Sequence, residues 1–166
     1  MLPLESLIRD LNERGGRYVV VGGLAVVLHG HLRATGDIDL VVDLAPEQVD
    51  RTLAALEGAG FQPYLPVAPT HFADPAKRAV WVREQGMVVF SLRPRSGVPM
   101  VDLFLEHPMP FDQLWARSVV VNLRGVAVRI ASIDDLIALK RQAGRPEDLT
   151  DAEALTEIKR LRAEQP

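Results

Sequence analysis

Three aspartates interrupt two otherwise apolar stretches of this sequence. Asp37 and Asp39 lie one residue apart in the stretch DIDLVV, and Asp102 lies in the stretch MVDLF. Side chains alternate between the two faces of a β-strand, so Asp37 and Asp39 would share one face while Ile38 and Leu40 point to the other. Their Cα atoms would then stand roughly 6–7 Å apart. Because two like charges at this separation repel each other, a bound cation would stabilise the arrangement.

The chemistry that suits such carboxylates is the binding of a hard divalent cation. Mg²⁺ is commonly held by one or two carboxylates together with phosphate oxygens of a substrate, and Mn²⁺ accepts the same kind of ligand. If the strands lie side by side, Asp37, Asp39 and Asp102 form one cluster. Such a cluster could hold two metal ions ~3.5–4 Å apart, an arrangement used for displacement at phosphorus. The alternative is that these aspartates are hydrated strand ends or pair with an arginine.

A glycine pair, Gly22-Gly23, lies between a predicted strand and a predicted short helix. Glycine permits a close approach of the backbone to a ligand, and the N-terminus of a helix directs free N–H groups towards anions. The pair therefore outlines a phosphate-binding site, although paired glycines are also common in turns.

Two cations and one hydroxyl are candidates to complete a nucleotide-binding site. Lys140 falls near the middle of the apolar face of a helix predicted over residues 133–143, where a lysine needs a partner. It can extend to the rim of that face or, as we expect, reach the carboxylate cluster or a triphosphate. Arg33 lies four residues before Asp37 and suits phosphate oxygens, but a salt bridge to an aspartate or exposure to solvent explains it equally well. Thr35 would place its hydroxyl or backbone near the metal site.

The pattern of apolar residues and turn signals predicts the elements that position these side chains. Their order does not alternate regularly between strand and helix, so we expect an α/β (α+β) fold with a mixed sheet and helices mainly on one face. The segment 66–75 is turn-rich and has no clear assignment. The predicted helices cover residues 4–11, 24–28, 46–58, 111–116, 133–143 and 146–162, and the predicted strands cover 17–21, 37–42, 61–65, 87–92, 100–104, 119–123 and 126–130.

Length and composition restrict the class of protein. A chain of 166 residues suits a single domain spanning residues 1–166, with C-terminal helices at about 132–162 packed on it. The net charge of -3 argues against extensive DNA binding, and the absence of cysteine excludes disulfides and thiolate metal sites. There is no signal-peptide pattern and no apolar run of the ~20 residues that cross a membrane. We therefore expect a cytoplasmic protein without membrane contact.

The spacing of these motifs resembles that of the DNA polymerase β-type nucleotidyltransferase superfamily. Val21-Gly22-Gly23 is followed after 13 residues by Asp37-Ile38-Asp39, and Asp102 matches the later third carboxylate. Three further stretches are similar to small bacterial AbiEii-like nucleotidyltransferases of toxin–antitoxin systems. They are A-x-x-L-H-G at residues 25–30, R-x-T-x-D-I-D at 33–39 and DLIALKRQAGRPEDL at 135–149.

The resemblance implies a palm-like nucleotidyltransferase fold and a Mg²⁺-dependent reaction. A nucleoside monophosphate would pass from an NTP such as ATP to an acceptor hydroxyl, with release of pyrophosphate. Asp37, Asp39 and Asp102 would be the catalytic residues and metal ligands. Gly22, Gly23, Arg33, Thr35 and Lys140 would bind the nucleotide.

The resemblance leaves the acceptor open: a tRNA, a protein and a small molecule all fit, and a cognate toxin or antitoxin is an expected partner. One departure is that many active members carry Ser where this chain has Gly23. The chain is also short for the extra helical domain with which larger members hold an acceptor. These departures favour the alternative, a weak or inactive nucleotidyltransferase-fold binding module.

Overall fold

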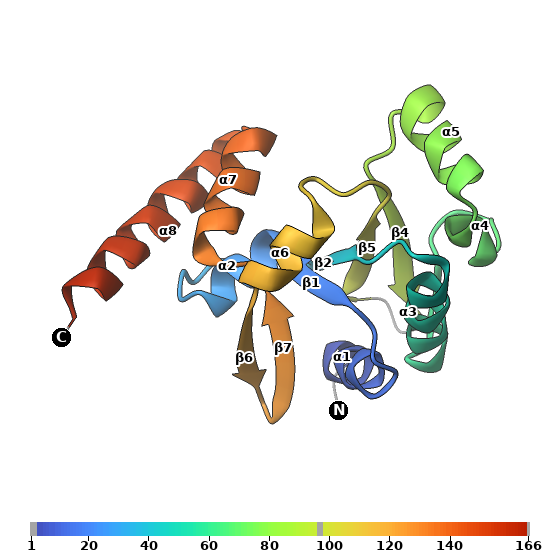
Figure 1. Ribbon diagram of the computed structural model, residues 1–166, viewed down its shortest axis with the longest axis horizontal. Coiled ribbons are helices and arrows are strands. Elements are labelled where there is room, and N and C mark those ends of the chain that lie inside the picture. The colour runs from blue at the N-terminus through green and yellow to red at the C-terminus, as the bar shows by residue number, and fades with distance from the viewer. Residues whose placement is uncertain (1–2, 96–97, 166) are drawn as a thin grey trace.

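The computed structural model describes residues 3–95 and 98–165, which form eight helices and seven strands (Figure 1). The helices are α1 (Pro3–Glu13), α2 (Gly22–Leu28), α3 (Pro46–Gly58), α4 (Thr70–Ala73), α5 (Pro75–Gln85), α6 (Phe111–Arg117), α7 (Ile133–Ala143) and α8 (Pro146–Glu164). The strands are β1 (Tyr18–Val21), β2 (Asp37–Val42), β3 (Phe61–Pro63), β4 (Val89–Pro94), β5 (Met100–Phe104), β6 (Val119–Leu123) and β7 (Val126–Ile130).

The strands form one mixed sheet in the order β3-β4-β5-β2-β1-β7-β6. The β2–β5 and β1–β7 pairs are parallel, and the other neighbours are antiparallel. This confirms the predicted α/β fold with a mixed sheet. Because β2 and β5 are separated in sequence by β3, β4 and three helices, their pairing is a long-range feature of the fold.

Apolar residues on one face of the sheet form much of the core. Ile38 and Leu40 of β2 are buried, as the alternation predicts, and Leu103 of β5 lies on the same face. Phe90 of β4, paired with Leu103, is fully buried. Its ring stacks against Phe72 of α4 and Trp81 of α5, with ring centroids 5.6 and 5.3 Å apart.

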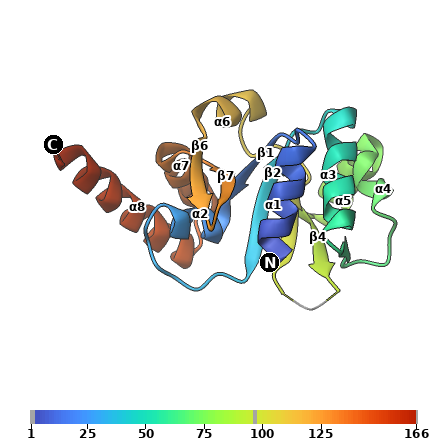
Figure 2. The ribbon, with the colours of Figure 1, turned by 90° about the horizontal axis from the view of Figure 1, so that it is seen from below.

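Helices α1 and α3 contact each other, α1 also contacts β7, and α3 contacts β2 and β3 (Figures 1 and 2). Together with α4 and α5, these helices cover the face of the sheet that carries Leu40 and Phe90. Because side chains alternate along a strand, the aspartates of β2 lie on the opposite face. Burial of the large apolar side chains supplies the main driving force for holding β2 and β5 in this position.

Helix α5 and the short helix α4 were not predicted from the sequence. The α5 stretch PAKRAVWVREQ carries few apolar residues in a helical repeat, and Trp81 is the apolar side chain that it buries. Its end signals are nevertheless present. Asp74 accepts hydrogen bonds from the backbone N–H groups of Ala76 and Lys77, and Gly86 ends the helix in the left-handed conformation with φ +63°.

Helices α7 and α8 form an antiparallel hairpin beside α2, and α8 extends away from the sheet towards the C-terminus (Figure 1). Ser132 caps α7 by accepting a hydrogen bond from the Asp135 backbone N–H. No helix in the described ranges is both long and apolar enough to cross a membrane.

Candidate active site

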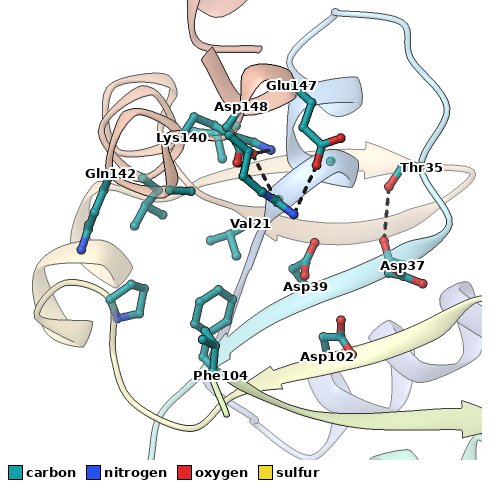
Figure 3. A pocket seen from close by; sticks show the side chains of 18 of the residues that line it. Val21, Thr35, Asp37, Asp39, Asp102, Phe104, Lys140, Gln142, Glu147 and Asp148 are labelled. Atoms are coloured by element: carbon teal, nitrogen blue, oxygen red, sulfur yellow. Dashed lines mark hydrogen bonds and ion pairs between the residues drawn. The ribbon is translucent and has the colours of Figure 1, made fainter. Parts of the chain in front are cut away.

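The register of the sheet brings the three predicted carboxylates to one place. In the parallel β2–β5 pair, Asp39 lies opposite Asp102 and Asp37 lies opposite Met100. Directly opposed residues point to the same face, so Asp39 and Asp102 are neighbours there, and Asp37 follows two residues away along the strand. Figure 3 shows the three side chains side by side on adjacent strands. The juxtaposition that the sequence analysis required is therefore present.

Gly22 lies directly against Asp39. The antiparallel β1–β2 pair places Val21 opposite Asp39, and Gly22 follows with a left-handed φ of +65°. A β-carbon on Gly22 would lie 1.9 Å from Asp39 Oδ2. Glycine is thus required both by backbone conformation and by the close approach of the carboxylate.

The predicted short helix is present, and it begins at the glycine pair itself, since α2 spans Gly22–Leu28. α2 has seven residues, about two turns, so its dipole is small and adds little to anion binding. The structure agrees with the phosphate-binding prediction in that Gly22 and Gly23 line the same cavity as the three aspartates.

The side chains of Thr35 and Arg33 fill the space above Gly23. A β-carbon there would lie 2.7 Å from Thr35 Oγ1 and 3.5 Å from the Arg33 guanidinium. The Thr35 hydroxyl makes a long hydrogen bond of 3.4 Å to the Asp37 carbonyl oxygen, which leaves it weakly held (Figure 3). A hydroxyl group therefore stands at the place that a serine side chain at position 23 would otherwise need.

Burial perturbs the pKa values of Asp39 and Asp102, and repulsion from neighbouring carboxylates adds to its effect. Burial raises the pKa of Asp39 to about 6, with further increases from the charges of Asp102 and Asp37 and a partial offset from Lys140 and Arg145. Burial also raises the pKa of Asp102. A hydrogen bond from the Ser91 hydroxyl partly lowers this pKa, and the charge of Asp37 raises it further. Perturbations of this kind, at neighbouring acids in a cavity, are typical of functional sites.

The donor set fits a divalent cation in chemical type. Asp102 Oδ1 is buried with no hydrogen-bond partner, and an unpaired buried carboxylate oxygen is costly unless a proton or a cation satisfies it. Among the described residues, no group of three acidic or histidine side chains is arranged as a ready-made metal centre. Mg²⁺ is commonly bound by one or two carboxylates together with substrate phosphate oxygens, so its binding does not require a preformed centre of three side chains.

The predicted cation Lys140 is buried, but its partners differ from those expected. Its ammonium lies 2.9 Å from Asp148 Oδ1 and 2.9 Å from Asp151 Oδ2, both on α8. Arg33 pairs with the same Asp151, with Nη1 and Oδ2 2.5 Å apart. Neither cation makes an ion pair with the β2 and β5 aspartates, because α8 supplies closer carboxylates. Lys140 and Arg33 nevertheless border the same cavity as those aspartates.

Asp148 and Asp151 are the residues that sequence reasoning missed. Asp148 lies in the first turn of α8, where acids are favoured for structural reasons, and neither residue is among the site residues predicted from the sequence. Their exposed fractions are 1% and 2%. The signal that could have found them is spacing, since residues three apart share one face of a helix, here together with Ala152 and Leu155, which are also buried.

A cavity of about 560 Å³ joins these features, a size suited to a small-molecule ligand. One end is polar and includes the glycine pair, Thr35 and the three aspartates (Figure 3). The other end is apolar and lies between the β4–β5 side of the sheet and α7. Its apolar wall comprises Val88, Phe104, Pro108, Leu136, Leu139 and Ala143.

The sheet, the glycine pair and the facing carboxylates define a protein of the nucleotidyltransferase type. The chain belongs to the family described as nucleotidyltransferase of unknown function (DUF6036), whose family model matches residues 2–96. The matched part contains Gly22, Gly23, Asp37 and Asp39, whereas Asp102 and the α7–α8 hairpin lie beyond it. No functionally curated protein matches the chain.

Solved structures share the fold at low sequence identity. The lincosamide antibiotic adenylyltransferase LnuA, solved with lincomycin bound, has a TM-score of 0.59 and 15% identity over 94% of this chain and 96% of its own. The antibiotic-resistance factor ANT(2'')-Ia has a TM-score of 0.57 and 15% identity over 94% and 80%. An antigenic nucleotidyltransferase-like protein from Paracoccidioides brasiliensis has a TM-score of 0.58 and 19% identity over 95% and 73%.

Proposed function

We propose that this protein transfers a nucleoside monophosphate from an NTP to an acceptor hydroxyl. The observation that carries the proposal is the direct opposition of Asp39 and Asp102 on parallel strands, beside Asp37 and a glycine whose missing side chain leaves room for Asp39. The polar end of the cavity would receive the triphosphate, and the apolar end would receive the less polar part of a substrate.

The reaction is a displacement at the α-phosphorus of the NTP. The acceptor oxygen forms a bond to that phosphorus, the bond between it and the oxygen bridging to the β-phosphorus breaks, and pyrophosphate leaves. Asp102, whose pKa is raised by burial, would take the proton of the acceptor hydroxyl. The hydroxyl of Thr35 and the cations Arg33 and Lys140 would contact phosphate oxygens and balance their charge.

A divalent cation, Mg²⁺ or in its place Mn²⁺, would be held by Asp37, Asp39 and Asp102. When bound, it supplies charge neutralisation at the phosphates and orients them for in-line attack. The buried and unpaired Asp102 Oδ1 supports this assignment. The residues of the chain would otherwise act by positioning the two substrates, which can account for a large part of the rate enhancement in phosphoryl transfer.

The acceptor that we propose to test first is a small hydroxylated molecule. Two neighbours in fold are named as antibiotic adenylyltransferases or resistance factors, and the cavity has the volume of a small-molecule site. Both observations support testing ATP as the donor and small hydroxylated molecules as acceptors first, with tRNA and proteins next. The AbiEii-like toxin–antitoxin assignment, with its cognate partner, stays a prediction from the sequence motifs.

The rival proposal is a binding module without transferase activity, which Gly23 in place of serine would favour. The position of the Thr35 hydroxyl above Gly23 weighs against it, because a hydroxyl group is supplied from another residue. The unpaired carboxylate oxygen of Asp102 also weighs against it, since a module that only binds a partner gains nothing from that cost.

The test is transfer of label from α-³²P-labelled NTPs, in the presence of Mg²⁺, to fractions of a cell lysate and to a panel of small hydroxylated molecules. We expect one fraction to become labelled by the wild-type protein but not by the D39N variant. The D134N variant, which alters an exposed ion pair with Lys159 on α8, is the matched control and should label like wild type. Equal labelling by wild type and D39N would contradict the proposal.

A binding measurement separates the two proposals if no acceptor is found. A nucleotidyltransferase should be stabilised against heat by an NTP only when Mg²⁺ is present, because ligands that bind the folded state raise its stability. No stabilisation at millimolar NTP and Mg²⁺ would favour the binding module.

A further inference from the structure

Two buried acids of α8 hold three cations at the wall of the nucleotide cavity. Asp151 contacts both Lys140 and Arg33, while Asp148 contacts both Lys140 and Arg145. The cations come from three separate segments: the loop before β2, the last turn of α7 and the junction between α7 and α8. All three line the cavity that contains Asp37, Asp39 and Asp102. The two acids are thus shared counter-charges for a set of cations that faces the proposed triphosphate site.

The remaining charged groups around this network lie at its margin. Glu147 contacts Arg145 at 3.2 Å from a side chain that is 59% exposed, so water screens that pair. The His31 ring lies 4.0 Å from Asp151, at the outer limit of an ion pair. The strong contacts of Asp151 are therefore those with Lys140 and Arg33.

Because Asp148 and Asp151 are buried, a contribution to the stability of the fold does not readily explain their presence. Removing two carboxylates and an ammonium from water carries a large desolvation cost, which the ion pairs return only in part. Apolar residues of similar volume would often hold two helices together equally well. What the charged network does, and apolar residues cannot do, is fix the direction of cations that would otherwise be mobile.

The geometry of Lys140 fits this function. An ammonium carries three N–H donors, and Asp148 and Asp151 accept from it in two directions. The third donor is available for a group in the cavity that Lys140 lines. Similarly, Asp151 accepts a hydrogen bond from Nη1 of Arg33, and this nitrogen is the guanidinium atom that lies nearest to Gly23. Asp151 therefore holds the Arg33 guanidinium at the glycine end of the cavity.

We propose that Asp151 and Asp148 are positioning residues, which hold Lys140 and Arg33 ready for the phosphate groups of the nucleotide. This inference rests on the proposed function. Cations fixed in advance lose little freedom when the triphosphate binds, so more of their interaction with phosphate appears as affinity. The opposite role is that the acids compete with phosphate for the cations, in which case their removal would strengthen binding.

The experiment compares D151N with wild type by isothermal titration calorimetry, with Mg²⁺-ATP and with inorganic tripolyphosphate as ligands. Asn keeps the volume of Asp but removes its charge. We expect D151N to weaken both ligands about tenfold, because charge-assisted contacts to phosphate are strong only when well directed. D134N serves again as the control for loss of an acid in the same hairpin. Unchanged or tighter binding by folded D151N would overturn the inference.

A second background shows whether Asp151 acts through Lys140. In K140M, the substitution D151N should weaken binding by a smaller factor than in wild type, since one of the two cations that it positions is absent. An undiminished factor would overturn the role of Lys140. If D151N alone does not fold, D148N carries the same expectation in the wild-type background, and its unchanged binding would overturn the inference.

The outcomes distinguish this inference from the proposed function. A wild-type protein that binds neither Mg²⁺-ATP nor tripolyphosphate contradicts both. A wild-type protein that binds both ligands, with a D151N variant that binds them equally well, leaves the nucleotidyltransferase proposal in place and removes only the positioning role of α8.

Discussion

The carboxylate of Asp39 occupies the space that a side chain on Gly22 would need. Their closeness follows from the β1–β2 register, which places Asp39 opposite Val21 at the point where the chain turns into α2. A β-carbon on Gly22 would lie 1.9 Å from Asp39 Oδ2. The position of a proposed metal ligand therefore depends on the absence of a side chain at Gly22, seventeen positions earlier in the sequence.

The G22A substitution should consequently damage both stability and the site. Alanine must adopt the left-handed φ of +65°, which costs about 1–2 kcal/mol, and its methyl group must displace the Asp39 carboxylate. We expect a loss of about 2–4 kcal/mol in the free energy of unfolding, measured with urea, and loss of Mg²⁺-dependent NTP binding. G36A is the matched control, because a β-carbon at Gly36 meets nothing within 4 Å. Equal unfolding midpoints for the two variants would contradict this account.

The raised pKa of Asp39 predicts how stability depends on pH in the absence of metal. The pKa is about 6 in the folded protein against an ordinary value of 3.8, so the folded state binds this proton more tightly than the unfolded state does. The stability that the proton contributes is complete below pH ~4 and is lost as pH rises through about 6. The shift corresponds to at most ~3 kcal/mol, which partial exposure to solvent reduces to about 1–2 kcal/mol.

The D39N variant isolates this contribution, because asparagine does not titrate. In EDTA, we expect D39N to gain about 1–2 kcal/mol relative to wild type between pH 4 and pH 7, measured by urea unfolding across that range. Mg²⁺ should reduce the advantage of D39N at pH 7 by stabilising the ionised wild-type cluster. If the difference in unfolding free energy between D39N and wild type did not change with pH, burial and repulsion would not raise the pKa of Asp39 as described.

Gly23 and Thr35 should behave as a coupled pair. A serine at position 23 places its β-carbon 2.7 Å from Thr35 Oγ1, so G23S should push Thr35 aside and weaken NTP binding by about tenfold, the cost of one or two misplaced hydrogen bonds. T35A should weaken binding by a smaller factor. The double variant G23S/T35A removes the closest atom and leaves a contact of 3.1 Å to the β-carbon of residue 35.

We therefore expect the double variant to bind an NTP more tightly than G23S does, as measured by calorimetry. Such non-additivity is characteristic of residues in direct contact. Effects of the two substitutions that simply add would mean that the hydroxyl of Thr35 does not substitute for a side chain at position 23.

Phe90 is expected to hold the strand that supports Asp102. Its fully buried ring stacks between Phe72 and Trp81, and it pairs with Leu103, the residue after Asp102. F90A should cost about 3–5 kcal/mol in urea unfolding, since it removes a large buried side chain and leaves a cavity. F90L, which keeps more of the volume, should cost clearly less. An F90A variant as stable as wild type would contradict the packing described for α4 and α5.

Much of the site could be read from sequence because it is locally encoded. The alternation in DIDLVV places Asp37 and Asp39 on one face of β2, and β2 and β5 have the predicted bounds. The Ser132 cap and the proline at the start of α8 likewise act within a few residues. Helix α5 escaped prediction because its amphipathic pattern is weak, although its end signals at Asp74 and Gly86 are local too.

The amino-acid sequence by itself determined which residues are candidates for the chemistry and which face of each strand they occupy, because side-chain alternation and helix spacing depend only on neighbours in the chain. The tertiary structure alone decided that Asp102 lies opposite Asp39, and that Lys140 and Arg33 pair with Asp151 instead of the β2 aspartates. Asp39 and Asp102 are 63 positions apart in the sequence, and Arg33 and Asp151 are 118 apart, whereas Lys140 and Asp151 are only 11 apart. Strand register and the packing of α8 set them, and both depend on burial summed over the whole core.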